Sequence, residues 1–287
     1  MGFGGALMWT ALVRNLRRQR PDRKVVLVYG GRPSSDHDIY RHNPDIAAVV
    51  PRRHWSWQRF FTRGVVAVDQ SLAAAQPIDG ETPERLLYRT GRHTVAIACA
   101  AYGVPCETVQ PRIELAADEV ARASAVLAAA GLDGRPFLCI EPAGKDSFTP
   151  NKLWFPERWR QLAEKLAGTV TLVQLGLGGG DALPGAVDLR NRLSFRETAE
   201  VLRRARGLVT TMGGLVHLNK AVDGRAVVLV SGYEPEELAT YADDINFYRS
   251  MDCSNCGLKT PCPIGRECMA RIGVDDVEQA CHRLLAS

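Results

Sequence analysis

The chain has 287 residues, of which 46% are hydrophobic, so it can bury the cores of one large or two medium-sized domains. Its formal net charge of +4 is too small to indicate nucleic-acid binding, although it suits an anionic substrate or an acidic membrane surface. No apolar run approaches the ~20 residues that cross a bilayer, and the N-terminus lacks the basic region of a signal peptide. We therefore expect a soluble, cytoplasmic protein whose eight cysteines are reduced thiols or metal ligands rather than disulfides.

The first 115 residues alternate helical patterns with short apolar strands, which predicts an α/β layer. The glycine-rich residues 2–5 precede a basic helix over 11–20, which is usually a solvated face and less often a contact with anionic lipid. The sequence predicts strands over 24–30, 45–50 and 65–69, and a helix over 93–102.

A second series of strands and helices begins at residue 116. Strands are predicted over 137–141, 169–176, 186–189, 208–211 and 225–232, and helices over 118–130, 156–167, 194–205, 215–222 and 275–285. Two successive series joined by a short crossing imply two Rossmann-like domains, 1–115 and 116–287, that face each other across a cleft. Ligands of such sheets bind beyond the carboxyl ends of the strands.

The stretch from 207 to 221 reads as a strand, a glycine pair and the start of a helix. Gly213 and Gly214 would let a ligand approach the backbone, and the free N–H groups of the helix N-terminus favour an anion such as phosphate. His217, one turn into the helix, can reach the same anion. A plain tight turn and a histidine inside a packing face are the alternatives.

This segment resembles the donor-site motif of glycosyltransferase family 9, the ADP-heptose heptosyltransferases of lipopolysaccharide synthesis and their relatives. The family motif is an acidic residue, a small residue and Gly-Leu-x-His-Leu, and this chain has MGGLVHL at 212–218. The resemblance extends to NKLWFPERW at 151–159, RLSFRETAEVLRRA at 192–205, the C-terminal cysteines and the first residues of the chain.

The resemblance implies the GT-B layout, with an acceptor-side domain at 1–115. The domain at 116–287 would bind the nucleotide sugar and carry a cysteine cluster at 253–268 and a final helix. The strand that precedes the first glycine loop in the family is missing, so either it lies upstream of Met1 or this domain is built differently.

The resemblance also implies the residues that bind the nucleotide sugar. They are Lys152, Leu193, Met212, Gly213, Gly214 and His217. GT-B enzymes usually stabilise the leaving pyrophosphate without a metal, using helix N-termini and basic side chains, so we expect no cofactor for catalysis. A surface lysine beside a helix cap is the alternative for Lys152. Met212 stands where the family has an acidic residue, so it cannot accept a hydrogen bond from ribose or orient His217.

Gly5 stands where the family has the aspartate proposed as the catalytic base. A glycine cannot take a proton, so the catalytic residue is unknown. Candidate replacements are Asp36, His37 and Asp38, although an exposed turn cluster is the better reading of these three.

The second constellation is Cys253, Cys256, Cys262 and Cys268, spaced C-x2-C-x5-C-x5-C. Close-spaced thiolates separated by glycine and proline can wrap a tetrahedral ion, which favours a structural zinc or iron. The autotransporter-modifying branch of the family is similar in using four cysteines for iron. Reduced, partly buried thiols are the alternative. The other four cysteines lie in apolar elements and are expected in the core: Cys99, Cys106, Cys139 and Cys281.

These observations favour an inverting glycosyltransferase that transfers a sugar, preferentially heptose, from an ADP-sugar to a glycan or protein acceptor. The alternative is a catalytically inactive family member that acts as a nucleotide-sugar-binding or assembly subunit, as Gly5 and Met212 suggest. A nucleotide-binding epimerase is weaker, because the chain lacks a typical dinucleotide fingerprint. We expect the protein in the cytoplasm, with peripheral contact at the inner membrane as an alternative, and no nucleic-acid partner.

Overall fold

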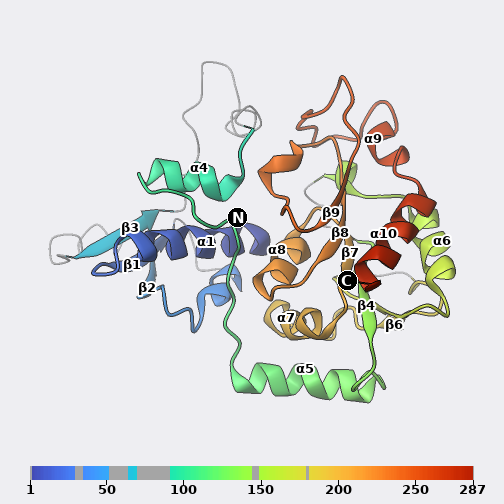
Figure 1. The fold of residues 1–287 in the computed structure, drawn as a ribbon, viewed down its shortest axis with the longest axis horizontal. Coiled ribbons are helices and arrows are strands. Elements are labelled where there is room, and N and C mark those ends of the chain that lie inside the picture. Colours follow the sequence, from blue (N-terminus) through green and yellow to red (C-terminus); the bar gives the residue numbers. More distant parts are fainter. Residues whose placement is uncertain are drawn as a thin grey trace. The chain divides into compact units, whose positions relative to one another are not determined.

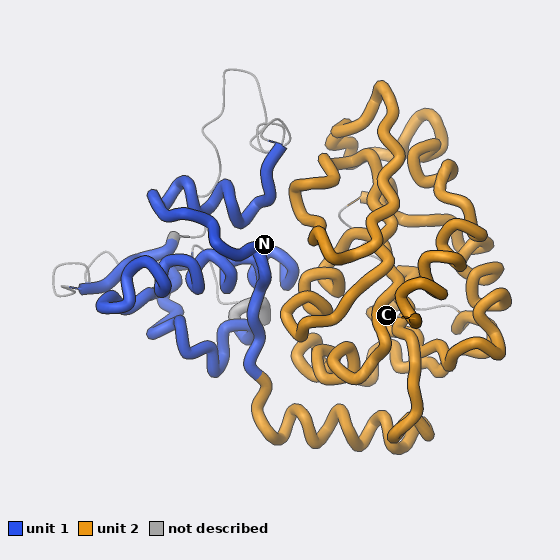
Figure 2. Tube along the Cα trace, in the orientation of Figure 1, with its two compact units in different colours: residues 1–114 blue, residues 115–287 orange. Residues whose placement is uncertain are grey.

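The computed structural model describes residues 2–29, 35–51, 64–69, 91–143, 149–178 and 181–286, with the side chains of 35–37 and 69 left out. The chain divides into two compact units, Met1–Glu114 and Leu115–Ser287 (Figure 2). The assignment of the first unit to the acceptor and of the second to the nucleotide sugar remains a prediction.

The described part of the first unit is an α/β layer with a parallel sheet, as predicted. Strand β1 lies between β2 and β3. The elements in chain order are α1 (Phe3–Gln19), β1 (Lys24–Tyr29), the 3-10 helix η1 (Ser35–Tyr40), β2 (Ala48–Pro51), β3 (Val65–Asp69) and α4 (Thr94–Ala101).

The glycine loop that the family resemblance implies at residues 2–5 is not formed, because helix α1 begins at Phe3 and includes Gly5 in its first turn. The residues that follow explain the longer helix. Ala6, Leu7 and Leu12 are completely or almost completely buried, and the helix packs against α4 and β1. Burial of this apolar face outweighs the roughly 1 kcal/mol by which a glycine disfavours a helix.

Buried Asn15 ties α1 to the extended segment that follows α4. Its amide nitrogen donates to the carbonyls of Ala11 (2.9 Å) and Thr108 (2.8 Å). Its amide oxygen accepts from the backbone N–H groups of Glu107 (2.8 Å) and Thr108 (3.2 Å). The Asn15 amide group thus donates two hydrogen bonds and accepts two, all of them within the first unit.

The second unit contains a six-stranded parallel sheet in the order β6-β5-β4-β7-β8-β9 (Figure 1). The strands are β4 (Phe137–Glu141), β5 (Thr171–Gln174), β6 (Val187–Asp188), β7 (Leu208–Thr211), β8 (Ala226–Val230) and β9 (Ile245–Tyr248). The order grows outward in one direction from β4 and in the other from β7, as in a doubly wound Rossmann-like fold. In such folds ligands bind beyond the carboxyl ends of the strands where the order reverses, which here are β4 and β7.

The helical elements of this unit connect its strands or flank the sheet. They are α5 (Ala117–Ala129), η2 (Pro150–Lys152), α6 (Pro156–Leu166), α7 (Phe195–Arg204), α8 (Gly214–Ala221), η3 (Glu236–Leu238), α9 (Glu267–Ala270) and α10 (Val274–Ala286). Helix α6 begins at the predicted Pro156, and Ser194 caps α7 with Glu197 completing the predicted capping box. The core includes Trp159 from α6 and Leu284 from α10, which pack with the sheet.

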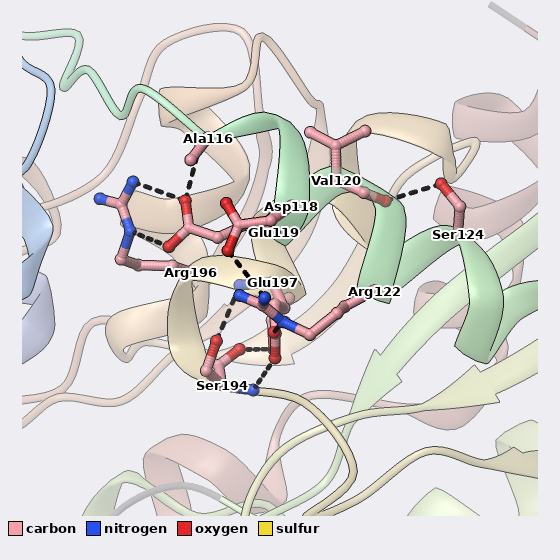
Figure 3. A network of polar contacts seen from close by, with 10 residues as sticks. Ala116, Asp118, Glu119, Val120, Arg122, Ser124, Ser194, Arg196 and Glu197 are labelled. Carbon is pink, nitrogen blue, oxygen red and sulfur yellow. Dashed lines mark hydrogen bonds and ion pairs between the residues drawn. The ribbon is translucent and has the colours of Figure 1, made fainter.

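Polar contacts fix α5 against α7 (Figure 3). The Arg196 guanidinium donates to both carboxylate oxygens of Glu119, at 2.7 and 2.9 Å, and both side chains are buried. Glu119 also accepts from the backbone N–H of Ala116 (2.8 Å), the residue before α5. Such a buried, bidentate ion pair fixes the two helices against each other, because leaving either charge buried without its partner would lower the stability of the fold.

None of the helices in the described ranges combines the length and the apolarity that a bilayer crossing requires.

Candidate functional site

Glu141 is the last residue of β4 and lies at the point where the strand order reverses. The Thr210 hydroxyl, from neighbouring β7, donates to its carboxylate at 2.8 Å. From the loop after β5, Gly176 approaches so closely that a Cβ there would stand 3.2 Å from the Glu141 carboxylate. Burial raises the pKa of Glu141 to about 8, although the Thr210 hydrogen bond acts in the opposite direction. A carboxyl group whose pKa is raised to near neutral pH therefore lies at the carboxyl end of β4, where the strand order reverses.

The glycine turn follows β7 in the predicted order of strand, turn and helix. Gly213 is extended, and helix α8 begins at Gly214. Both glycines are partly exposed, whereas Met212 is buried. A Cβ on Gly213 would meet only the Thr211 carbonyl oxygen, at an ordinary 3.7 Å, so the protein's own packing does not demand glycine here. The turn leaves the N-terminal amides of α8 approachable for an anion.

His217 is buried in α8 and contacts Tyr241. Its Nδ1 lies 2.8 Å from the Tyr241 hydroxyl, and the two rings meet edge to face with centroids 5.8 Å apart. Lys220, one turn further along, forms an ion pair with Asp243 and lies over the Tyr241 ring. Tyr241 therefore fixes the orientation of His217, a task that Met212 cannot perform.

Lys152 ends the short helix η2 after β4. Its ammonium group pairs with the Glu234 carboxylate at 2.5 Å and lies 4.9 Å from the centre of the Tyr233 ring. The Lys152 and Glu234 side chains are only 17% and 13% exposed. Glu234 follows β8, so the pair joins loops from the carboxyl ends of two strands of one sheet. Lys152 is thus a partly buried, paired cation rather than a solvated surface lysine.

Leu193 lies partly buried between β6 and the cap residue of α7. Its contact with an adenine remains a prediction.

The base candidates Asp36, His37 and Asp38 remain predictions. Gly5 lies within α1, and the side chains of Asp36 and His37 fall outside the described residues. Asp38 is exposed and pairs with Arg41 at 3.4 Å, as expected of a turn residue.

The four cysteines of the C-terminal cluster are neighbours in space. Burial raises the pKa of Cys256, and repulsion from thiolates at Cys253, Cys262 and Cys268 raises it further. Cys268 Sγ lies 3.6 Å from the place of a Cβ on Gly232. In the described part of the chain, however, no three His, Cys, Asp or Glu side chains are placed so that they could hold a metal ion.

A cavity of about 880 Å³ lies at the opposite end of the second unit's sheet, away from the predicted residues. Its lining includes Pro136 and Val170, which directly precede β4 and β5, and Arg206, which lies two residues before β7. Ligands of doubly wound sheets bind at the carboxyl ends, so we do not assign the site to this cavity.

Sequence reasoning missed three residues of the site: Glu141, Glu234 and Tyr241. Each lies at or after the carboxyl end of a strand of the same sheet, or in the connection that leaves it. The acidic residue at the end of the apolar β4 was the one visible signal, because a buried strand rarely ends in an unpaired carboxylate.

Residues 71–265, more than half of the chain, match the family model described as glycosyltransferase family 9 (heptosyltransferase). No protein in the curated set matches the chain by sequence.

Solved structures share the fold at low sequence identity. A family 9 glycosyltransferase from Veillonella parvula is 13% identical with a TM-score of 0.74, covering 100% of this chain and 95% of its own. Escherichia coli heptosyltransferase WaaC with ADP is 14% identical with a TM-score of 0.62, covering 99% and 97%. The iron-containing dodecameric glycosyltransferase TibC of enterotoxigenic E. coli is 16% identical with a TM-score of 0.58, covering 92% and 76%.

Proposed function

The chain belongs to glycosyltransferase family 9, and from that membership we propose that it transfers a sugar, preferentially heptose, from an ADP-sugar to a glycan or protein acceptor. WaaC, whose fold it shares, has been solved with ADP and with ADP-2-deoxy-2-fluoro heptose. The proposal includes the GT-B arrangement, inversion at the anomeric carbon and an acceptor that approaches from the first unit.

One observation carries the proposal: the predicted donor residues all follow carboxyl ends of strands in a single doubly wound sheet. Lys152 follows β4, Leu193 follows β6, and the glycine turn with His217 follows β7. Because the strands are parallel, these loops lie along one edge of the sheet, the edge at which such sheets bind nucleotides.

Transfer of the sugar requires that the charge developing on the leaving diphosphate be stabilised. The amide groups at the start of α8 supply hydrogen-bond donors and the positive end of the helix dipole. Lys152 supplies a full positive charge, which the Glu234 carboxylate balances. A bound diphosphate would compete with Glu234 for the Lys152 ammonium group. Lys152 would exchange one anionic partner for another, so its charge would not be left unpaired in a partly buried site.

A second candidate function is that of a nucleotide-sugar-binding or assembly subunit without transfer activity. Gly5 favours it, because this residue lies inside α1 and offers no proton acceptor. Met212 favours it as well, because a buried thioether cannot accept a hydrogen bond from a ribose hydroxyl as a carboxylate can.

We also propose that Cys253, Cys256, Cys262 and Cys268 bind a structural zinc or iron ion, although their described arrangement is not that of a closed ligand set. Thiolate ligands suit both ions. Elemental analysis of protein produced with added zinc or iron tests this. One equivalent of metal that is lost in a Cys256→Ser, Cys262→Ser variant supports the site, and the absence of stoichiometric metal excludes it.

Peripheral contact with the inner membrane remains a prediction.

Calorimetric titration with ADP and ADP-heptose tests the donor site. The Lys152→Ala and His217→Ala variants should each weaken binding about tenfold or more, which corresponds to the ~1.5–3 kcal/mol of a hydrogen bond to a charged group. Lys165→Ala is the matched control, because Lys165 is a surface lysine paired with Glu278. Absence of ADP binding, or equal binding by wild type and both variants, would refute the proposal. Sugar transfer by the purified chain to any acceptor would exclude the inactive alternative.

A further inference from the structure

Residues 251–268, which we call the cysteine segment, lie against two loops of the donor site. One loop is η2 with its flanks and carries Lys152, and the other is the connection after β8 and carries Glu234. The segment contacts both loops through backbone and side-chain hydrogen bonds.

Asn151, directly before Lys152, makes the central contact. It is 5% exposed. Its amide nitrogen donates to the backbone carbonyls of Leu258 and Thr260, both at 2.8 Å. Its amide oxygen accepts from the backbone N–H of Cys262 at 3.0 Å. One side chain thus binds three positions of the cysteine segment, using both donors and an acceptor.

Two further contacts hold the same loop. The Thr149 hydroxyl donates to the Leu258 carbonyl at 2.9 Å and accepts from the Asn151 N–H at 3.2 Å. Arg266 donates from one guanidinium nitrogen to the carbonyls of Pro150 (3.2 Å) and Leu153 (2.9 Å). The backbone on both sides of Lys152 is therefore fixed from the cysteine segment.

The cysteine segment also fixes the loop of Glu234. The backbone N–H groups of Asn255 and Cys256 donate to the Gly232 carbonyl at 2.7 and 3.3 Å. The N–H of Gly257 donates to the Tyr233 carbonyl at 3.0 Å. A Cβ on Gly232 would lie 3.1 Å from the Ser254 hydroxyl oxygen, so the loop after β8 and the cysteine segment are in close contact.

We propose that Asn151 is a positioning residue for the donor site: through the cysteine segment it holds Lys152 opposite Glu234, ready to exchange that carboxylate for the diphosphate of the nucleotide sugar. The proposal rests on the proposed function as far as the diphosphate is concerned. Asn151 does not touch the ligand. It acts through Lys152, because the two are adjacent in the chain and Asn151 fixes the backbone from which the lysine extends.

The Asn151→Asp variant removes both donors and places a carboxylate opposite two carbonyl oxygens, with little change in volume. Thr149→Val is a milder variant that removes only a hydroxyl group. It provides the test if Asn151→Asp does not fold. Asn15→Asp is the matched control, since Asn15 is a buried amide with the same kind of contacts in the other unit. We expect about tenfold weaker ADP binding for Asn151→Asp, about threefold for Thr149→Val, and unchanged binding for Asn15→Asp.

A double-mutant cycle separates positioning from general destabilisation. If Asn151 acts through Lys152, the Asn151→Asp, Lys152→Ala protein binds ADP no more weakly than Lys152→Ala alone. Losses that multiply in the double variant would overturn the proposal, and so would an equal loss in Asn15→Asp.

A measurement without nucleotide tests the positioning even if the protein does not bind ADP. The rate at which an amine-acylating reagent modifies Lys152, followed by peptide mass spectrometry, should rise several-fold in Asn151→Asp and in Glu234→Gln, but not in Asn15→Asp. Unchanged Lys152 acylation in Asn151→Asp would refute the positioning role. A raised rate combined with no ADP binding by wild type would refute the proposed function and leave the positioning role standing.

Discussion

Replacing Glu141 by glutamine should make the protein more stable at neutral and alkaline pH. In the folded protein, burial raises the pKa of Glu141 from 4.5 to about 8. The folded state therefore keeps this proton while the unfolded state releases it, so stability falls as the pH rises from 4.5 to about 8 and then stays level. That pKa difference corresponds to roughly 5 kcal/mol at most, and partial exposure of the residue reduces the expected penalty to roughly 3–4 kcal/mol.

Glutamine keeps the carbonyl oxygen that accepts from the Thr210 hydroxyl and carries no charge at any pH. Urea unfolding between pH 5 and 9, followed by circular dichroism and tryptophan fluorescence, compares the two proteins. The curves of free energy of unfolding against pH should converge near pH 4.5–5 and separate steadily up to pH 8, with the glutamine variant above. Parallel curves across this range would refute the conclusion that Glu141 is a protonated carboxyl group in the folded protein at neutral pH.

Two other contacts give tests of stability and of function. Glu119→Ala leaves Arg196 buried without its partner and should lower the free energy of unfolding, measured in urea, by about 3–5 kcal/mol. The double variant Glu119→Leu, Arg196→Met should stay within about 1–2 kcal/mol of wild type. Equal losses in the two variants would show that the unpaired charge is not the cause. Tyr241→Phe removes the hydroxyl next to His217 Nδ1 and should weaken ADP binding several-fold with a small change in melting temperature. Nitrogen-15 NMR of the imidazole should show an altered tautomer in that variant, and an unchanged spectrum would contradict the orienting role of Tyr241.

The sequence predicted most elements of the second unit, because their signals are local. Pro156 and the pair Ser194 and Glu197 announce helix starts, and the apolar strands are bounded by glycine or charged residues. Strand β9 was missed, since its four residues are only partly apolar and gain their strand conformation by pairing with β8.

The start of the chain shows where local rules fail. The family resemblance implied a glycine loop at residues 2–5, but the apolar residues after it, spaced for a helix and buried against α4, extend α1 back to Phe3. Tertiary burial overrode glycine propensity, which is a weak preference by comparison.

The candidate site was predicted in part. The motif indicated Lys152 and His217, yet nothing in the sequence indicated their partners Glu234 and Tyr241, since each pair joins loops from different strands. The hydrogen bonds of Asn151 reach across 107 to 111 residues, a separation at which only the folded sheet determines neighbours.

The packing of α10 has a consequence for how the protein is made. This last helix lies against α6 and contributes Val277, Ala280 and Leu284 to the core (Figure 1). Gly207, before β7, is closed over by Leu284, which would stand 2.5 Å from a Cβ there. On the ribosome, the second unit therefore exposes an unfinished apolar surface until α10 has emerged, and the core of this unit cannot be completed before then.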